Sequence, residues 1–230
     1  MVYTALNTIG GLIEEVAPKI EKLTMWDCHV DGLTAKIISP DEFWGYEIIV
    51  FESMGINTAP KTEKGKIAFE RLKTISTLSA GMYLPTNSIL LISKNTLMKN
   101  PDVQAVILGH EIVHRCQDVN NPSFVKNWVA LFKSFGTNAF DDNLFENENF
   151  RKCHSGYNDL VESDAAHVTN QLIWNFYTLA DCRYTIGDNQ INILEDIQKK
   201  DGRAGINRLY GLSLTELYDL FNLSSIKDKQ

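Results

Sequence analysis

Residues 101–117 read PDVQAVILGHEIVHRCQ, and this stretch decides the fold around it. Asn100 can cap a helix, Pro101 suits the first helical position, and Asp102 suits the positive end of the helix dipole. Turn residues over 118–122 end the pattern. The sequence therefore predicts a helix from residue 100 to residue 117, and its many apolar residues indicate that the helix is buried.

Two histidines and a glutamate lie inside this predicted helix, as His110, Glu111 and His114. Side chains four residues apart lie on the same helical face, so both imidazoles can bind one zinc ion. Glu111 can then act as the general base towards a water that the ion activates. Two solvated or core histidines are the plain alternative, but unpaired polar groups inside an apolar helix are costly. We therefore expect a catalytic zinc centre with His110 and His114 as ligands.

The same helix resembles the core of a zincin metallopeptidase when it is taken together with residues 88–93, SILLIS, which precede it as a predicted strand. The resemblance implies that this strand borders the active-site cleft and that an extended peptide substrate pairs with its edge. The metzincin pattern H-E-x-x-H-x-x-G-x-x-H is absent, because Gln117 and Asn120 occupy its last two defined positions. The third metal ligand is therefore expected on a later helix.

Residues 160–166, LVESDAA, resemble the second-helix motif of the gluzincin group of zincins. The resemblance implies that Glu162 is the third zinc ligand and that Asp164 matches a following motif position. Ala166 stands where the group often has an aspartate that orients a ligand histidine. The substitute for that aspartate is left open between Asp159, Asp164 and a backbone carbonyl.

Other polar residues remain candidates for the site. His154, Asp164 and His167 are rival metal ligands, although the spacing of His167 turns it away from the helical face of Glu162. A residue that hydrogen-bonds the developing oxyanion is left open among four side chains: Tyr157, His154, Tyr177 and Arg183. Gln117, one turn beyond His114, is expected to border the metal centre.

The predicted fold class is α+β: one zincin-like domain over residues 1–230, with a small mixed sheet packed on the active-site helix and a mostly helical C-terminal half. Residues 1–33 are expected to form an N-terminal helical segment, and residues 34–117 the sheet with the first active-site helix. Residues 118–185 are expected to form an insertion with the second metal-ligand helix, and residues 186–230 the C-terminal helices. Strands are expected over residues 34–39, 46–52 and 88–93. Further helices are expected over residues 7–23, 65–78, 124–135, 157–183, 191–199 and 213–220, and a loop over 141–149.

The 230 residues carry a net charge of −7, and 44% of them are hydrophobic. This composition is typical of a soluble globular protein, and the diffuse acidic charge disfavours nucleic acid and anionic membranes as partners. The first residues lack the pattern of a secretory signal peptide, and no stretch is apolar enough to span a bilayer. A cytoplasmic protein with its four cysteines as free thiols is the default expectation, and signal-less export as an effector is the alternative.

Hydrolysis of a peptide bond in a peptide or protein substrate is the activity that the resemblance implies, with Zn²⁺ as the cofactor. Three alternatives stay open: a non-catalytic zinc-binding or interaction module, a non-peptide amidase, and an effector or toxin protease that cuts one specific protein. Glu111 disfavours the first of these, because a structural zinc site has no use for a general base.

Overall fold

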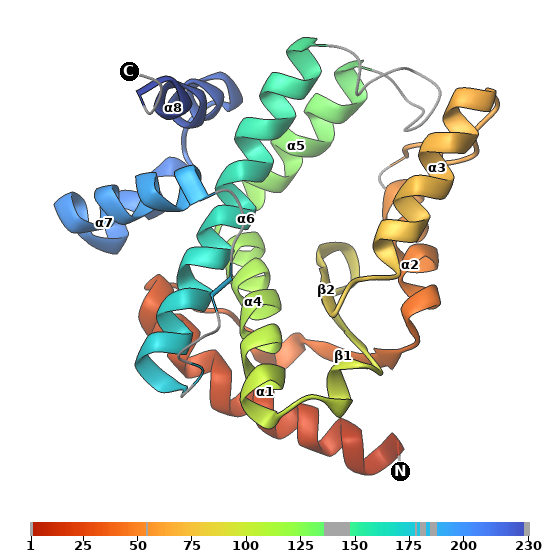
Figure 1. Ribbon diagram of the computed structural model, residues 1–230, viewed down its shortest axis with the longest axis vertical. Helices are drawn as coiled ribbons and strands as arrows, with labels where there is room; N and C mark the ends of the chain where they lie inside the picture. The colour runs from red at the N-terminus through yellow and green to blue at the C-terminus, as the bar shows by residue number, and fades with distance from the viewer. Residues whose placement is uncertain are drawn as a thin grey trace.

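The computed structural model describes residues 2–53, 55–135, 148–177, 179, 183–184 and 188–227. Helices predominate, and a three-stranded sheet lies beside them (Figure 1). The predicted α+β class is thereby confirmed in its coarse form. Among the described helices, none combines the length and the apolar character of a segment that crosses a bilayer.

The N-terminal part of the chain holds three helices and the first strand. They are α1 (Val2–Thr24), β1 (Thr34–Ile38), α2 (Phe43–Ser53) and α3 (Glu63–Ser76). The predicted helices over 7–23 and 65–78 and the predicted strand over 34–39 are confirmed, with ends shifted by a few residues. Such shifts are usual, because helix and strand ends are the least defined part of any sequence pattern.

The predicted strand over residues 46–52 is wrong, because these residues belong to the helix α2. Ser39 and Glu42 form a capping box immediately before it, which turns the chain into a helix. Phe43 and Trp44 are then buried in the first turn of α2. Tertiary packing and the cap therefore override the β-propensity of the Ile- and Val-rich run that follows.

The sheet has the order β1-β3-β2, where β2 is Gly81–Leu84 and β3 is Ile89–Ser93. Strand β1 pairs parallel with β3, and β2 pairs antiparallel with it, so the predicted small mixed sheet is confirmed. The prediction that the strand over 88–93 borders the cleft is wrong, because β3 is paired on both sides. The tight Pro85–Asn87 turn folds β2 back against β3, so that β2 is an edge strand and lies against the helix predicted to carry the active site.

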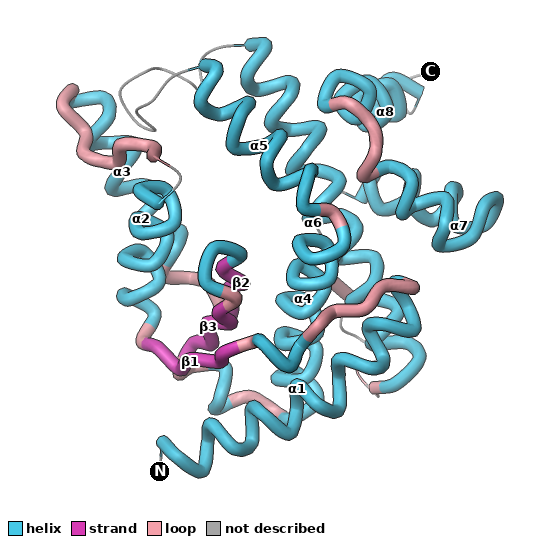
Figure 2. The backbone as a smooth tube through the Cα atoms, turned by 180° about the vertical axis from the view of Figure 1, so that it is seen from behind, coloured by secondary structure: helices cyan, strands magenta, loops and turns pink. Residues whose placement is uncertain are grey.

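That helix is α4 (Pro101–Asn120), and it lies side by side with α6 (Glu148–Phe176) through the middle of the molecule (Figures 1 and 2). Asn100 caps α4 by accepting a hydrogen bond from the backbone of Asp102, as predicted. Gly109 allows the close approach of the two helices, because a Cβ there would lie 2.5 Å from a methyl group of Leu172 on α6. The main core packs α1, α4, α6 and β3 together.

The remaining helices are α5 (Pro122–Phe135), α7 (Asp188–Leu209) and α8 (Leu214–Lys227). They confirm the predicted helices over 124–135, 191–199 and 213–220, although α7 and α8 are longer than predicted. Helix α6 begins at Glu148 rather than at residue 157 and ends at Phe176 rather than at residue 183. Of the predicted loop over 141–149, residues 141–147 lie outside the described residues. Helices α7 and α8 pack on α6 around a second core.

Cys28 and Cys116 form a disulfide bond between α4 and the segment that follows α1, and both are fully buried. The prediction of free thiols is therefore wrong for this pair. The two residues are 88 positions apart, and only the fold brings them together. Asn120 and Arg115 of α4 hold the segment of Cys28 by hydrogen bonds to its backbone carbonyls. Disulfides of this kind persist in oxidising compartments, so the structure gives no support to a reducing one.

Candidate metal centre

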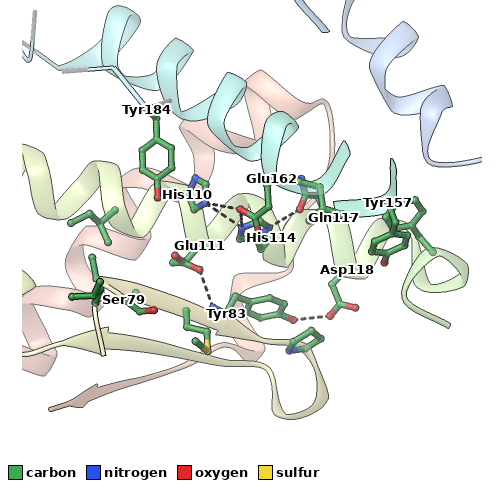
Figure 3. Close-up of a pocket in the computed structure, with 18 residues that line it drawn as sticks. Ser79, Tyr83, His110, Glu111, His114, Gln117, Asp118, Tyr157, Glu162 and Tyr184 are labelled. Atoms are coloured by element: carbon green, nitrogen blue, oxygen red, sulfur yellow. Dashed lines mark hydrogen bonds and ion pairs between the residues drawn. The ribbon is translucent and has the colours of Figure 1, made fainter. Parts of the chain in front are cut away.

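Two neighbouring helices bring three polar side chains together at one side of a pocket (Figure 3). His110 and His114 lie on α4, and Glu162 lies on α6. The Nε2 atoms of the two imidazoles are 3.2 Å apart, and the Oε2 atom of Glu162 is 3.6 Å from each of them. The three residues predicted as metal ligands therefore converge on one point.

The spacing of these atoms is that of ligands around a single metal ion. With zinc–ligand bonds of about 2.0–2.2 Å in a tetrahedral arrangement, neighbouring donor atoms lie about 3.3 Å apart. Two imidazole nitrogens and one carboxylate oxygen are also donors that zinc and similar divalent metals prefer. The group could therefore hold a divalent metal ion with little rearrangement of its side chains.

The electrostatics of the group favour a cation. Burial alone would raise the pKa of Glu162, but His114 and His110 beside it bring that pKa well below its usual value. Burial alone would lower the pKa of His114, but Glu162 and Glu111 raise it to about 9. Both shifts report a strong attraction between these carboxylates and positive charge at the imidazoles. A divalent cation that displaces the imidazole protons would take over this attraction.

The hydrogen bond behind His110 orients its ring for metal binding. The Oγ1 atom of Thr169 on α6 lies 3.3 Å from His110 Nδ1, and the Thr169 hydroxyl donates its own hydrogen to the carbonyl of Ala165. The Thr169 oxygen must therefore accept from His110, which places the imidazole hydrogen on Nδ1. The lone pair of the neutral ring is then on Nε2, the atom that faces His114 and Glu162.

Gln117 orients the imidazole ring of His114 by a hydrogen bond to its Nδ1 atom. Its amide nitrogen donates to the carbonyl of Val161, at 2.9 Å, and points at Asp164 Oδ2, at 3.4 Å. Both partners are acceptors, so the amide is held with its Oε1 atom towards His114 Nδ1, at 2.8 Å. Gln117 therefore borders the group of candidate metal ligands, and the residue fixes the Nε2 lone pair of His114.

The residue that replaces the aspartate expected at Ala166 is thus Gln117, supported by Asp164. Asp164 is fully buried, and Arg203 of α7 holds both of its oxygens. Tyr210 donates a further hydrogen bond to it at 2.6 Å. Burial alone would raise the pKa of Asp164, but Arg203 and Tyr210 keep it below its usual value. Asp164 is therefore no metal ligand.

Glu111 lies next to the group on the side of the sheet (Figure 3). Its carboxylate accepts a hydrogen bond of 2.9 Å from the backbone N–H of Tyr83 on the edge strand β2. Burial raises its pKa above the usual glutamate value, against the opposing effect of His110 and His114. Gly81 makes room for it, because a Cβ at this position would lie 3.0 Å from Cγ and 3.3 Å from Oε1 of Glu111. Strand β2 therefore sets the position of this carboxylate.

The centre opens onto a cavity of about 550 Å³ between β2 and the helices α4 and α6. His110, Glu111, His114 and Glu162 all line it. Its other walls come from the segment before β2, from β2 itself and from aromatic side chains, and they include Leu78, Tyr83, Phe124, Tyr157 and Tyr184. The polar group is therefore accessible to a molecule that enters this cavity.

Two of the rival ligands lie elsewhere or outside the described part. His167 is bonded to Gln198 of α7 by its Nε2 atom, at 2.6 Å, and takes no part in the centre. The side chain of His154 lies outside the described residues. Asp159, considered as a support for a ligand histidine, accepts instead from Gln190 at 3.4 Å.

Of the residues predicted as candidates for oxyanion binding, some line the cavity and others do not. Tyr157 lines the cavity, whereas the hydroxyl of Tyr177 lies between Lys19 and Glu15 of α1. Arg183 is exposed and does not line the cavity.

Sequence reasoning missed Tyr184, whose ring stacks on the His110 imidazole at 4.3 Å between centroids. The buried amide of Asn170 holds the Tyr184 backbone by two hydrogen bonds, of 2.7 and 3.0 Å. Burial, with Glu111 and Glu162 nearby, raises the pKa of Tyr184 to about 12, so its hydroxyl remains a donor at neutral pH. No periodic pattern marks this residue. Only its contact with the centre reveals it.

The chain's own geometry carries the functional interpretation of this centre. Comparison with protein-family models, with curated proteins and with solved structures finds no match to the chain.

Proposed function

We propose that this protein is a zinc-dependent metallopeptidase whose centre is built by His110, His114 and Glu162. The observation that carries the proposal is the convergence of their three donor atoms within 3.6 Å, with the buried Glu111 carboxylate beside them in the same cavity. Each of these side chains has the chemistry that its role requires, and the two imidazoles are oriented by separate hydrogen bonds.

A zinc ion bound by these residues would supply a Lewis acid that activates water and polarises a carbonyl group. Glu111 would take a proton from the attacking water, whose oxygen adds to the carbonyl carbon of the substrate. The same carboxylate would deliver that proton to the departing nitrogen as the C–N bond breaks, so that acid and amine products balance. Its raised pKa suits a group that must both accept and return a proton.

Strand β2 supports a peptide as the substrate. It pairs with β3 on one side only, and the Tyr83 N–H points away from β3 towards Glu111. The N–H and C=O groups of β2 that point away from β3 lie along its unpaired edge, beside the cavity. An extended peptide can add to such an edge as a further strand, which would lay its backbone across the centre.

Tyr184 is the residue that we assign to the developing oxyanion. Its hydroxyl lies close enough to Glu111 and Glu162 for both carboxylates to raise its pKa. The ring is held against His110, and the backbone is held by Asn170, so the donor is positioned before a substrate binds.

A purely structural zinc site is closed by four protein ligands. Among the residues that the structure describes, three are placed to bind one ion, and the group faces a cavity. This difference supports catalysis over a non-catalytic module.

The test compares the wild-type protein with Glu111→Gln. We expect about one zinc per chain in both proteins by elemental analysis, because Glu111 is not a ligand. In a screen of proteome-derived peptides, cleavage should fall by about 10²–10⁴-fold in the variant. Equal cleavage by the two proteins, or purified wild type that binds no zinc, would count against the proposal.

A further inference from the structure

The two ends of the cavity differ in chemistry (Figure 3). One end is closed by Tyr184, which stacks on His110. The other end holds Asp118 and Tyr157. The proposed hydrolysis makes no use of Asp118, so the carboxylate at this end needs an explanation of its own.

Asp118 continues the face of α4 that carries the centre. Positions 110, 114 and 118 are spaced by four residues, so their side chains lie on one face, a turn apart. The hydroxyl of Tyr83 donates to Asp118 Oδ2 at 2.7 Å and accepts from Arg115 at 3.0 Å. This contact fixes the orientation of the carboxylate. Among the described residues, none hydrogen-bonds its second oxygen, Oδ1.

Among the described residues, no Lys or Arg side chain lines this cavity. Its charged walls are the carboxylates Glu111, Glu162 and Asp118, besides the two histidines. The guanidinium of Arg115 does not line the cavity, and it is held by Tyr83, by Ser88 and by the carbonyl of His29. A metal ion would balance the charge of the centre itself. Asp118, a turn further along α4, would keep its negative charge facing the cavity.

Aromatic rings line the cavity near this carboxylate. Phe124 and Tyr157 line the same end and are stacked at 3.9 Å between centroids. Burial, and then the nearby charge of Asp118, raises the pKa of Tyr157. A carboxylate near aromatic rings suits a cation, because such rings attract positive charge as the carboxylate does.

We propose that the Asp118 end of the cavity is a subsite for a positively charged group, ammonium or guanidinium, on the N-terminal side of the bond that is cleaved. This inference rests on the proposed peptidase function and names its substrate class. Strand β2 runs from Gly81, beside Glu111, towards Tyr83, whose hydroxyl contacts Asp118. A peptide that pairs antiparallel with β2 runs the other way, so its N-terminal residues lie at the Asp118 end.

The positive group could belong to a Lys or Arg side chain or to the free α-amino group of the substrate. A peptide series separates the two sources. It carries Lys, Arg, norleucine or Glu at each of the three positions before and after the cleaved bond, with a free or an acetylated N-terminus. Cleavage is measured with the zinc-loaded wild type, and binding is measured with zinc-loaded Glu111→Gln, so that recognition is observed without turnover.

We expect the wild type to prefer a basic over a norleucine peptide by about ten- to a hundredfold at one position before the bond, as for a charge-assisted hydrogen bond. Dependence on acetylation instead would identify the α-amino group as the source. In Asp118→Asn, the ratio of cleavage of the preferred peptide to cleavage of its uncharged counterpart should fall close to one, whichever group is the source. Tyr83→Phe keeps the carboxylate and should keep most of the preference. The matched control is Asp159→Asn, which removes the same charge from a residue outside the cavity and should not alter the preference.

An unchanged preference in Asp118→Asn, or no preference for a positive group in either assay, would overturn the subsite. A preference confined to positions after the bond would overturn its placement. Failure of the proposed function looks different, because Glu111→Gln would then cleave as well as the wild type, whatever the preference of Asp118→Asn.

Discussion

Two carboxylates of α6, only two residues apart, have opposite surroundings. Asp164 is fully buried, and its oxygens are bonded by Arg203, Tyr210 and the amide of Gln117. The side chain of Glu162 is 32% exposed and faces two imidazoles across 3.6 Å, at the wall of a cavity. The protein completes the first group with its own partners. The second group is a convergent set of donors that a cation would complete.

This difference distinguishes a structural cluster from a binding centre. Removing one member of a completed buried ion pair leaves a charge without compensation, and the cost appears in folding. Removing one member of a convergent donor set costs affinity for the ligand, with a smaller effect on the fold. The two groups are linked through Gln117, which contacts both Asp164 and His114.

The largest effect on stability is expected for Asp164→Asn. The change leaves the buried Arg203 guanidinium without its counter-charge, so the unfolding free energy of the metal-free protein should fall by about 3–5 kcal/mol. Urea unfolding of metal-free protein measures it. Asp159→Asn is the control, because this half-buried carboxylate has only one hydrogen bond to the described residues, a long one from Gln190. A loss for Asp164→Asn no greater than for the control would show that the cluster is not structural.

Glu162→Ala should give the reverse pattern. Zinc affinity should fall by more than about a hundredfold, because the loss of a direct ligand exceeds the 10–100-fold typical of an outer partner. The unfolding free energy of the metal-free protein should change less than in Asp164→Asn. Competition with a chelator of known affinity gives the first quantity and urea unfolding the second. Wild-type zinc affinity in this variant would remove Glu162 from the centre.

Gln117→Leu tests the link between the two groups. Without the amide, the Nδ1 hydrogen of His114 loses its acceptor, and zinc affinity should fall by about 10–100-fold. Gln198→Leu makes the same chemical change at a residue that contacts His167 outside the centre, and it should leave affinity unaltered. Equal effects of the two variants would mean that Gln117 has no positioning role.

The smallest effect is expected for Gly81→Ala, which acts on Glu111 from the strand side. The added methyl group would push the carboxylate by a few tenths of an ångström, and kcat should fall by about tenfold or less at unchanged zinc content. Gly45→Ala is the control, because a Cβ there meets nothing within 4 Å. A fall in zinc content would show that the added methyl group disturbs the metal ligands rather than Glu111.

The sequence was informative where structure depends on local spacing. The cap at Asn100, the one-turn separation of His110 and His114, and the placement of Glu162 on a second helix all follow from short patterns. The position of Glu162 opposite the histidines needed the family resemblance, because no local rule relates α6 to α4.

What the sequence did not show depends on long-range packing. Strand β2 has four residues, too few for a periodic pattern, yet it supplies the edge that holds Glu111. The Cys28–Cys116 bond joins segments that only the packing of α1 on α4 brings together. Thr169 and Tyr184 reach the centre from positions that carry no motif, and the run over 46–52 is helical because of its cap and its buried aromatic residues.

Anomalous diffraction at the zinc edge, from crystals of the purified protein, would locate a zinc ion held by His110, His114 and Glu162. We expect one zinc per chain, bound at about 2.0–2.2 Å by His110 Nε2, His114 Nε2 and a Glu162 oxygen. Zinc at another position, or these three side chains ordered around no metal after zinc is supplied in excess, would contradict this expectation.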